Sequence, residues 1–145
     1  MDEQDRQIIA LLVENGRRTY DDIAQRVSLS APTVKQRVDR LRSRGALRGF
    51  TAIVDPGALG DNTEALIELF YAPGTLLDAV TNTLRRHPEV VEAWSVTGEA
   101  DAIARVRTQN NADLERLIMD LQRDGHVVRT RSQVVMSQLV SRSGS

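Results

Sequence analysis

Apolar side chains recur at helical spacing in three segments within the first 45 residues. The first predicted helix runs from about residue 2 to residue 14 and ends at Asn15-Gly16. Thr19 and Ser30 are suited to cap the second and third helices, and Asp22 is placed to complete a capping box with Thr19. The third helix ends at Gly45. The side chains predicted to face inward are Ile8, Ile9, Leu12 and Val13 in the first helix, Ile23, Ala24 and Val27 in the second, and Val34, Val38 and Leu41 in the third.

The rest of the chain alternates between strand and helix patterns. Residues 47–54 are rich in β-branched and aromatic side chains, which predicts a strand, and Asp55-Pro56-Gly57 predicts a linker after it. Beyond the linker we expect strands at 64–71, 90–97, 101–108 and 127–136, with helices at 75–86 and 111–123. This β-α-β-β-α-β order is ferredoxin-like. The predicted fold class is α+β: a helix-turn-helix, winged-helix-like domain at 1–54, a linker at 55–62, and a ferredoxin-like domain at 63–145.

In this topology both helices of the second domain cover one face of the sheet, which leaves the other face open. Along strand 90–97, Val90, Trp94 and Val96 are predicted to point to one side, and Val91 and Ala93 to the other. Both sides therefore carry apolar side chains, which predicts a homodimer formed sheet to sheet. Trp94 fits the core of such a dimer better than the wall of a ligand pocket.

Composition excludes several classes of protein. The chain has 145 residues, 41% of them hydrophobic and 27% charged, which is typical of a globular protein without membrane spans. The acidic start, Met1-Asp2-Glu3, does not resemble a secretory signal, so we expect a cytoplasmic, nucleoid-associated protein. No cysteine is present, which excludes disulfides, thiolate metal sites and a cysteine nucleophile.

The net charge of −1 conceals an uneven distribution. Residues 1–60 carry ten basic and eight acidic side chains, whereas residues 61–145 carry nine and twelve. Within residues 31–48, six basic side chains accompany the single acid Asp39. The third helix therefore presents a basic stripe, which is the electrostatic signature of a nucleic-acid contact.

A basic helix that follows another helix after a short turn is suited to enter the major groove of DNA. There Gln36, Arg37 or Arg40 can bond to base edges, and Ala31 or Thr33 can touch a thymine methyl. Phosphates are the expected partners of the remaining basic residues. The full set of candidate DNA contacts is Ser30, Ala31, Thr33, Lys35, Gln36, Arg37, Arg40, Arg42 and Arg44.

The alternative is that this is a basic surface helix without a partner. The three-helix spacing and the capped second helix favour the interpretation that the third helix binds DNA. Asp39 is the exception on this face, because a carboxylate near phosphates is repulsive unless it pairs with Lys35 or Arg42 or accepts from a cytosine amine.

The chain resembles the Lrp/AsnC family, the leucine-responsive and asparagine-operon (feast/famine) regulators. The resemblance covers about residues 2–137 and rests on the following segments: Asp5-Arg6-Gln7-Ile8-Ile9-Ala10-Leu11-Leu12, Asn15-Gly16-Arg17, Ile23-Ala24 to Ser30, Val34-Lys35-Gln36-Arg37-Val38 to Leu41, Gly45, Gly49-Phe50-Thr51-Ala52 and Thr97-Gly98-Glu99-Ala100-Asp101. It implies dimers formed through the second domain, often assembled into tetramers or octamers, and paired DNA-reading units on double-stranded DNA. It also implies amino acids or related metabolites as effectors.

The turn at residues 97–101 is the candidate effector site. The carboxylates of Glu99 and Asp101 suit an ammonium, and the accessible N–H of Gly98 suits a carboxylate. On spacing alone these residues fit a solvated turn better than a ligand site. The resemblance implies that Gly98, Glu99 and Asp101 contact the effector with support from Thr97, and that Thr130 and Ser132 reach the site across an interface. Ala102 departs from the larger residue common in relatives, so the pocket wall differs.

No pattern of catalytic residues is present. His87 and His126 lack spaced metal-ligand or nucleophile partners, and no glycine-rich phosphate loop occurs. We therefore expect no enzymatic activity, no metal and no cofactor. The sequence predicts a DNA-binding transcription regulator of amino-acid or related metabolism. Two alternatives stay open: a ligand-independent architectural DNA-binding protein, and an amino-acid-sensing regulatory subunit of an enzyme.

Overall fold

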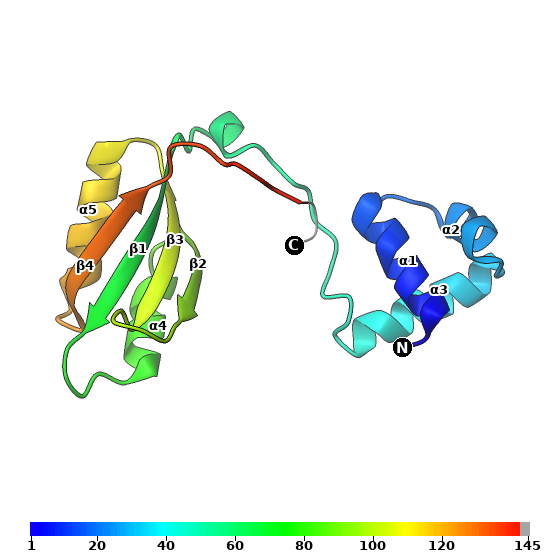
Figure 1. Ribbon diagram of the computed structural model, residues 1–145, viewed down its shortest axis with the longest axis horizontal. Coiled ribbons are helices and arrows are strands. Elements are labelled where there is room, and N and C mark those ends of the chain that lie inside the picture. The colour runs from blue at the N-terminus through cyan, green and yellow to red at the C-terminus, as the bar shows by residue number, and fades with distance from the viewer. Residues whose placement is uncertain (143–145) are drawn as a thin grey trace. The chain divides into compact units, whose positions relative to one another are not determined.

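The computed structural model describes residues 1–142, in two compact units (Figure 1). Unit 1 comprises Met1–Ile53 together with the C-terminal residues from Leu139, and unit 2 comprises Val54–Gln138. The last three residues of the expected second domain, 143–145, lie outside the described residues. No helix among those described is long and apolar enough to cross a membrane.

Unit 1 is built on three helices, α1 (Glu3–Glu14), α2 (Tyr20–Val27) and α3 (Ala31–Ser43). Thr19 and Ser30 cap α2 and α3 as predicted, accepting from the N–H groups of Asp22 and Thr33 respectively. A buried cluster joins the three helices and contains Ile8, Leu12, Ile23, Ala24, Val27, Val34 and Val38. The predicted apolar stripes therefore meet in one core. Two predicted inward residues are exceptions: Val13 is exposed, and Ile9 is only partly buried and lies outside this cluster.

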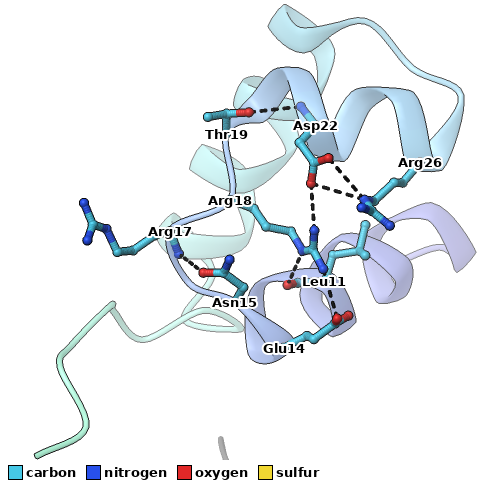
Figure 2. A network of polar contacts seen from close by, with 8 residues as sticks. All are labelled: Leu11, Glu14, Asn15, Arg17, Arg18, Thr19, Asp22 and Arg26. Atoms are coloured by element: carbon cyan, nitrogen blue, oxygen red, sulfur yellow. Dashed lines mark hydrogen bonds and ion pairs between the residues drawn. The ribbon is translucent and has the colours of Figure 1, made fainter.

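The side chain of Arg18 contacts both α1 and α2, as Figure 2 shows. Its guanidinium donates to the carbonyl of Leu11 at 3.2 Å and to Asp22 at 2.8 Å, and it forms an ion pair with Glu14 at 3.0 Å. The Asp22 carboxylate also accepts from Arg26. The predicted capping box at Thr19 is therefore wrong in its second half, because the carboxylate of Asp22 is engaged by two arginines instead of the Thr19 backbone.

The predicted strand at 47–54 is also wrong. Residues 48–55 adopt neither helix nor strand, and the short 3-10 helix η1 (Pro56–Leu59) follows them. An extended segment becomes a strand only when its backbone groups pair with a neighbour. Among the described residues, no backbone hydrogen bond links 48–54 to another segment.

Unit 2 holds a four-stranded antiparallel sheet in the order β2-β3-β1-β4. The strands are β1 (Thr63–Tyr71), β2 (Val90–Ser95), β3 (Ala102–Thr108) and β4 (Val127–Val134). Helices α4 (Leu77–Arg85) and α5 (Asn111–Gln122) lie on the same face (Figure 1). This is the predicted β-α-β-β-α-β order, with element ends shifted by one or two residues because helix and strand termini are weakly marked in sequence.

Alternation along the inner strands places the core of unit 2 between the sheet and the helices. The buried cluster takes Ala65, Ile67 and Leu69 from β1, Ala102, Ala104 and Val106 from β3, Val80 and Leu84 from α4, Leu114, Leu117 and Leu121 from α5, and Val127. Intervening residues of β1 and β3 occupy the open face. Both central strands therefore show the period-2 pattern of a sheet covered on one side.

A bulge in β2 changes the orientation predicted for one residue. Val90 pairs with Val106, but Glu92 pairs with Arg105, so Val91 is the extra residue. Val90 consequently packs on the core, whereas Trp94 pairs with Ile103 on the open face. The prediction that Val90 and Trp94 point to the same side is wrong, because strict alternation does not survive an inserted residue.

Replacing Ile67 by Ala should lower the free energy of unfolding by about 2–5 kcal/mol, because Ile67 is fully buried at the centre of the sheet. Met119→Ala on α5 is the matched control, since Met119 is 62% exposed. Urea denaturation of both variants measures the difference. Equal stabilities would show that this core does not hold unit 2 together.

Candidate functional site

Helix α3 exposes most of the predicted DNA-contacting residues. Val34, Val38 and Leu41 are buried, which orients the opposite side of the helix outward. The exposed candidates are Ser30, Lys35, Gln36, Arg40, Arg42 and Arg44, while Ala31, Thr33 and Arg37 are partly buried. The burial pattern therefore turns a basic face to solvent, as the helical wheel predicts.

The turn between α2 and α3 fixes where α3 begins. Ser28 adopts a left-handed conformation with φ of 57°, and the N–H of Leu29 donates to the carbonyl of Ala24 at 3.0 Å. The hydroxyl of Ser30 lies 2.8 Å from that of Thr33 and also accepts from its N–H. The first turn of α3 is thus held by its own side chains, with Ser30 and Thr33 already hydrogen-bonded to each other.

Arg37 does not project from α3 as the sequence suggests. Its guanidinium donates to Asp2 at 2.7 Å, to Asp5 at 2.9 Å and to Gln4 at 3.1 Å, and its side chain is only 18% exposed. These acceptors all belong to the start of α1. An arginine engaged in this way has few donors left for a base edge, so Arg37 is less available to DNA in this structure than the exposed Arg40, and its base-reading role stays a prediction.

Arg40 shares one of these acceptors. It lies 3.8 Å from the same Asp5 Oδ1 that Arg37 contacts, yet its side chain is 46% exposed. We call this group the Asp5 clamp: Asp2, which is the N-cap of α1, Gln4 and Asp5 of α1, and Arg37 and Arg40 of α3. Sequence reasoning missed it, because the partners are more than thirty positions apart.

The charges of the Asp5 clamp shift the pKa values of its members. Hydrogen bonds from Arg37 and from the Asp5 backbone lower the pKa of Asp2 to about 2. Burial acts to raise the pKa of Asp5, but hydrogen bonds from Arg37 and the Asp2 backbone outweigh it and the pKa is lowered. A carboxyl whose pKa is lowered by folding stabilises the fold above its unfolded pKa and ceases to do so only as pH falls through the folded value. The lowered pKa values therefore keep the carboxyls of Asp2 and Asp5 ionised at neutral pH.

Two other basic residues of α3, Lys35 and Arg42, each contact one side chain. Lys35 lies 2.7 Å from Asp39, and this hydrogen bond raises the pKa of Lys35. Arg42 stacks over the ring of Phe50, with 5.9 Å between the guanidinium carbon and the ring centroid. The pairing with Lys35 resolves the placement of Asp39, because a neutralised carboxylate does not repel phosphate. Among residues 1–142, the side chains of Gln36 and Arg44 make no hydrogen bond or ion pair.

The turn at 97–101 joins β2 to β3, and Asp101 anchors it. The Asp101 N–H donates to the carbonyl of Leu69, and its carboxylate accepts from the N–H of Tyr71 at 2.8 Å. Tyr71 lies at the bulge where the register between β1 and β4 shifts. One oxygen of the expected effector-binding carboxylate is therefore occupied in holding the turn against β1. Gly98 has φ of 107°, a conformation that glycine adopts without strain.

Glu99 is the free carboxylate of this turn. Its side chain is 80% exposed and lies 3.8 Å from Arg131, which also pairs with Glu68. The ladder matches Leu69 with Thr130 and Ile67 with Ser132, so these hydroxyl residues share the helix-covered side of the sheet. Within one chain, the structure brings Glu99 together with Arg131 and not with Thr130 or Ser132. Period-2 alternation along β4 is the signal that identifies Arg131.

The described residues form no metal site. Within residues 1–142 no group of three or more His, Asp or Glu side chains is arranged to hold a metal ion. His87 and His126 lie at the ends of elements, before β2 and before β4.

Comparison with known proteins identifies both units. Residues 1–42 match the AsnC-type helix-turn-helix domain, and residues 64–144 match the Lrp/AsnC ligand binding domain. The HTH-type transcriptional regulator Rv2324 of Mycobacterium tuberculosis is 42% identical over 146 residues, covering 98% of this chain and 96% of that protein.

Two solved structures are similar to this chain over nearly its whole length. The leucine response regulatory protein LrpA of M. tuberculosis has a TM-score of 0.88 and 30% identity, covering 100% of this chain and 99% of that one. The feast or famine regulatory protein Rv3291c of M. tuberculosis, complexed with L-methionine, has a TM-score of 0.91 and 31% identity, covering 97% and 95%. These findings confirm the resemblance seen in the sequence, and the chain belongs to the Lrp/AsnC family of helix-turn-helix transcription regulators.

Proposed function

We propose that this regulator recognises specific DNA sequences through α3, and that an amino acid or similar small zwitterion modulates it by binding at the turn 97–101. The observation that carries the DNA proposal is the exposed basic face of α3, opposite Val34, Val38 and Leu41. Genes of amino-acid or related metabolism are the targets that such an effector suits.

The residues of this face differ in how firmly they are held, which suggests different roles. Gln36 and Arg40 present polar groups of the kind that bond in pairs to adenine and guanine edges. Lys35, Arg42 and Arg44 are long cations suited to phosphates. The N-terminal end of the helix adds Ser30, Ala31 and Thr33 as short-range contacts.

The effector proposal rests on complementary charges at the turn. Glu99 offers a carboxylate for an ammonium, and Arg131 with the N–H of Gly98 offers donors for a carboxylate. Rv3291c, 31% identical, has been solved with L-methionine, which supports this ligand class. Thr97 and Asp101 shape the turn. Because Thr130 and Ser132 face the other side of the sheet, we propose that they serve this site from a neighbouring copy.

The open face of the sheet suits a homodimer. Leu66, Phe70, Trp94 and Ile103 lie there among pairs such as Arg105 with Glu64. Arg129 stacks on Phe70 with 3.9 Å between its guanidinium carbon and the ring centroid. A second copy would bury these side chains and satisfy their charges reciprocally across a two-fold axis. Further association into tetramers or octamers would then place turns of different dimers together.

Substitution of Arg40 should separate base reading from phosphate binding. On duplexes selected from a random library, Arg40→Ala should weaken selected DNA about 10-fold more than random DNA. Arg44→Ala is the matched control, and it should weaken both duplexes equally while lowering the slope of log K against log salt by about 1. Fluorescence anisotropy at several salt concentrations measures both. Equal losses would contradict the division of roles, and a wild-type protein without salt-dependent DNA binding would favour an enzyme's regulatory subunit.

Effector binding should appear as thermal stabilisation of the protein. A ligand at 100 times its Kd adds about 2.7 kcal/mol to the free energy of unfolding, because it binds only the folded state. At least one of the twenty amino acids should therefore raise the melting temperature by several degrees. Glu99→Gln should weaken that ligand about 10-fold through loss of a charged hydrogen bond, whereas Glu115→Gln on the exposed side of α5 should not. A flat response to all twenty would favour the ligand-independent architectural protein.

A further inference from the structure

The Asp5 clamp places a buried carboxylate between two arginines of the DNA-facing helix. The Asp5 side chain is only 4% exposed, and its Oδ1 lies 2.9 Å from Arg37 and 3.8 Å from Arg40. Arg37 and Arg40 are three residues apart on α3, which places them on neighbouring positions of one helix face. A single oxygen atom on α1 therefore attracts both guanidinium groups.

The two arginines respond differently to this attraction. Arg37 gives its contacts to Asp2, Gln4 and Asp5 and is largely covered. Within residues 1–142 the Arg40 side chain has no other hydrogen bond or ion pair, and it lies at the edge of the carboxylate with 46% of its surface exposed. The clamp thus neutralises Asp5 through Arg37 and leaves Arg40 oriented but available.

We propose that Asp5 is a positioning residue for DNA recognition, which acts by fixing the Arg40 guanidinium before DNA binds. This inference rests on the proposed function of α3. A free arginine loses rotamer freedom when it docks on a base edge, and a pre-oriented one loses less, so pre-orientation strengthens binding. The benefit is confined to specific DNA, because contacts with phosphate need charge and not a fixed geometry.

The substitution Asp5→Asn tests this role, because it should affect the affinity for random DNA and the affinity for selected DNA differently. Asp2 and Asp5 form a capping box at the start of α1, in which each carboxylate accepts from the backbone N–H of the other residue. The amide oxygen of asparagine at position 5 can still accept from the N–H of Asp2, which preserves that half of the box. Removing a negative charge beside DNA should leave binding to random duplex unchanged or slightly tighter. Loss of the anchor for Arg40 should weaken binding to the selected duplex roughly 10-fold. The ratio of specific to random affinity should therefore fall although the total charge becomes more favourable.

Asp22→Asn is the matched control. Asp22 is likewise a carboxylate shared by two arginines, Arg18 and Arg26, but both lie outside α3. The Asp22→Asn substitution should alter the melting temperature without changing the ratio of specific to random DNA affinity. A purely electrostatic role for Asp5 would tighten both duplexes, and a purely structural role would weaken both along with the melting temperature; either result overturns the proposal.

A double-mutant cycle tests whether the effect passes through Arg40. In an Arg40→Ala background, Asp5→Asn should cause no further loss of the affinity ratio. An equal loss in both backgrounds would overturn the proposal while leaving the proposed function intact. If Arg40→Ala itself leaves the ratio unchanged, the base-reading role of Arg40 fails, and the inference fails with it.

A measurement on the unmodified protein removes any dependence on a folding defect. ¹⁵N relaxation of arginine Nε–H groups reports the mobility of each guanidinium on the nanosecond scale. Arg37 and Arg40 should be more ordered than Arg44, whose side chain has no partner within residues 1–142. Equal mobility of Arg40 and Arg44 in free protein would overturn the proposal.

Discussion

An ionised carboxylate stays buried only when a cation and hydrogen bonds compensate the loss of water, and Asp5 meets this condition through Arg37. The pairing joins the first turn of α1 to the middle of α3, so it fixes the helix proposed to read DNA relative to the rest of unit 1. It also determines which cations remain for DNA. The +5 charge of residues 31–48 overstates the free charge of this face, because Arg37 is already paired with Asp2 and Asp5, which lie outside that segment.

Local signals account for what the sequence predicted in unit 1. Thr19 and Ser30 mark helix starts through chemistry that acts within three residues, and the buried stripe of α3 follows from its spacing. The contacts of Arg37 and Arg18 depend on where whole helices pack, which a linear pattern does not encode. The segment 48–54 shows the converse, because its residues favour a strand but no described neighbouring segment forms backbone hydrogen bonds with it.

In unit 2 the order of elements was predictable and the register was not. A single extra residue, Val91, turns Val90 towards the core and leaves Trp94 on the open face. The ladder between β1 and β4 separates Arg131 from Thr130 and Ser132 and brings it to Glu99. At the turn 97–101, Asp101 holds the backbone while Glu99 remains exposed, so two carboxylates that look equivalent in sequence have different environments.

In the proposed mode of recognition α3 reads DNA, with Arg40 available to a base edge and Arg37 retained by α1. A crystal structure of the protein with a duplex selected from a random library tests this claim most directly. Arg40 should contact a base edge in the major groove, while Arg37 should stay within hydrogen-bonding distance of Asp2 and Asp5. An Arg37 side chain released into the groove, with Arg40 on a phosphate or in solvent, would contradict the account.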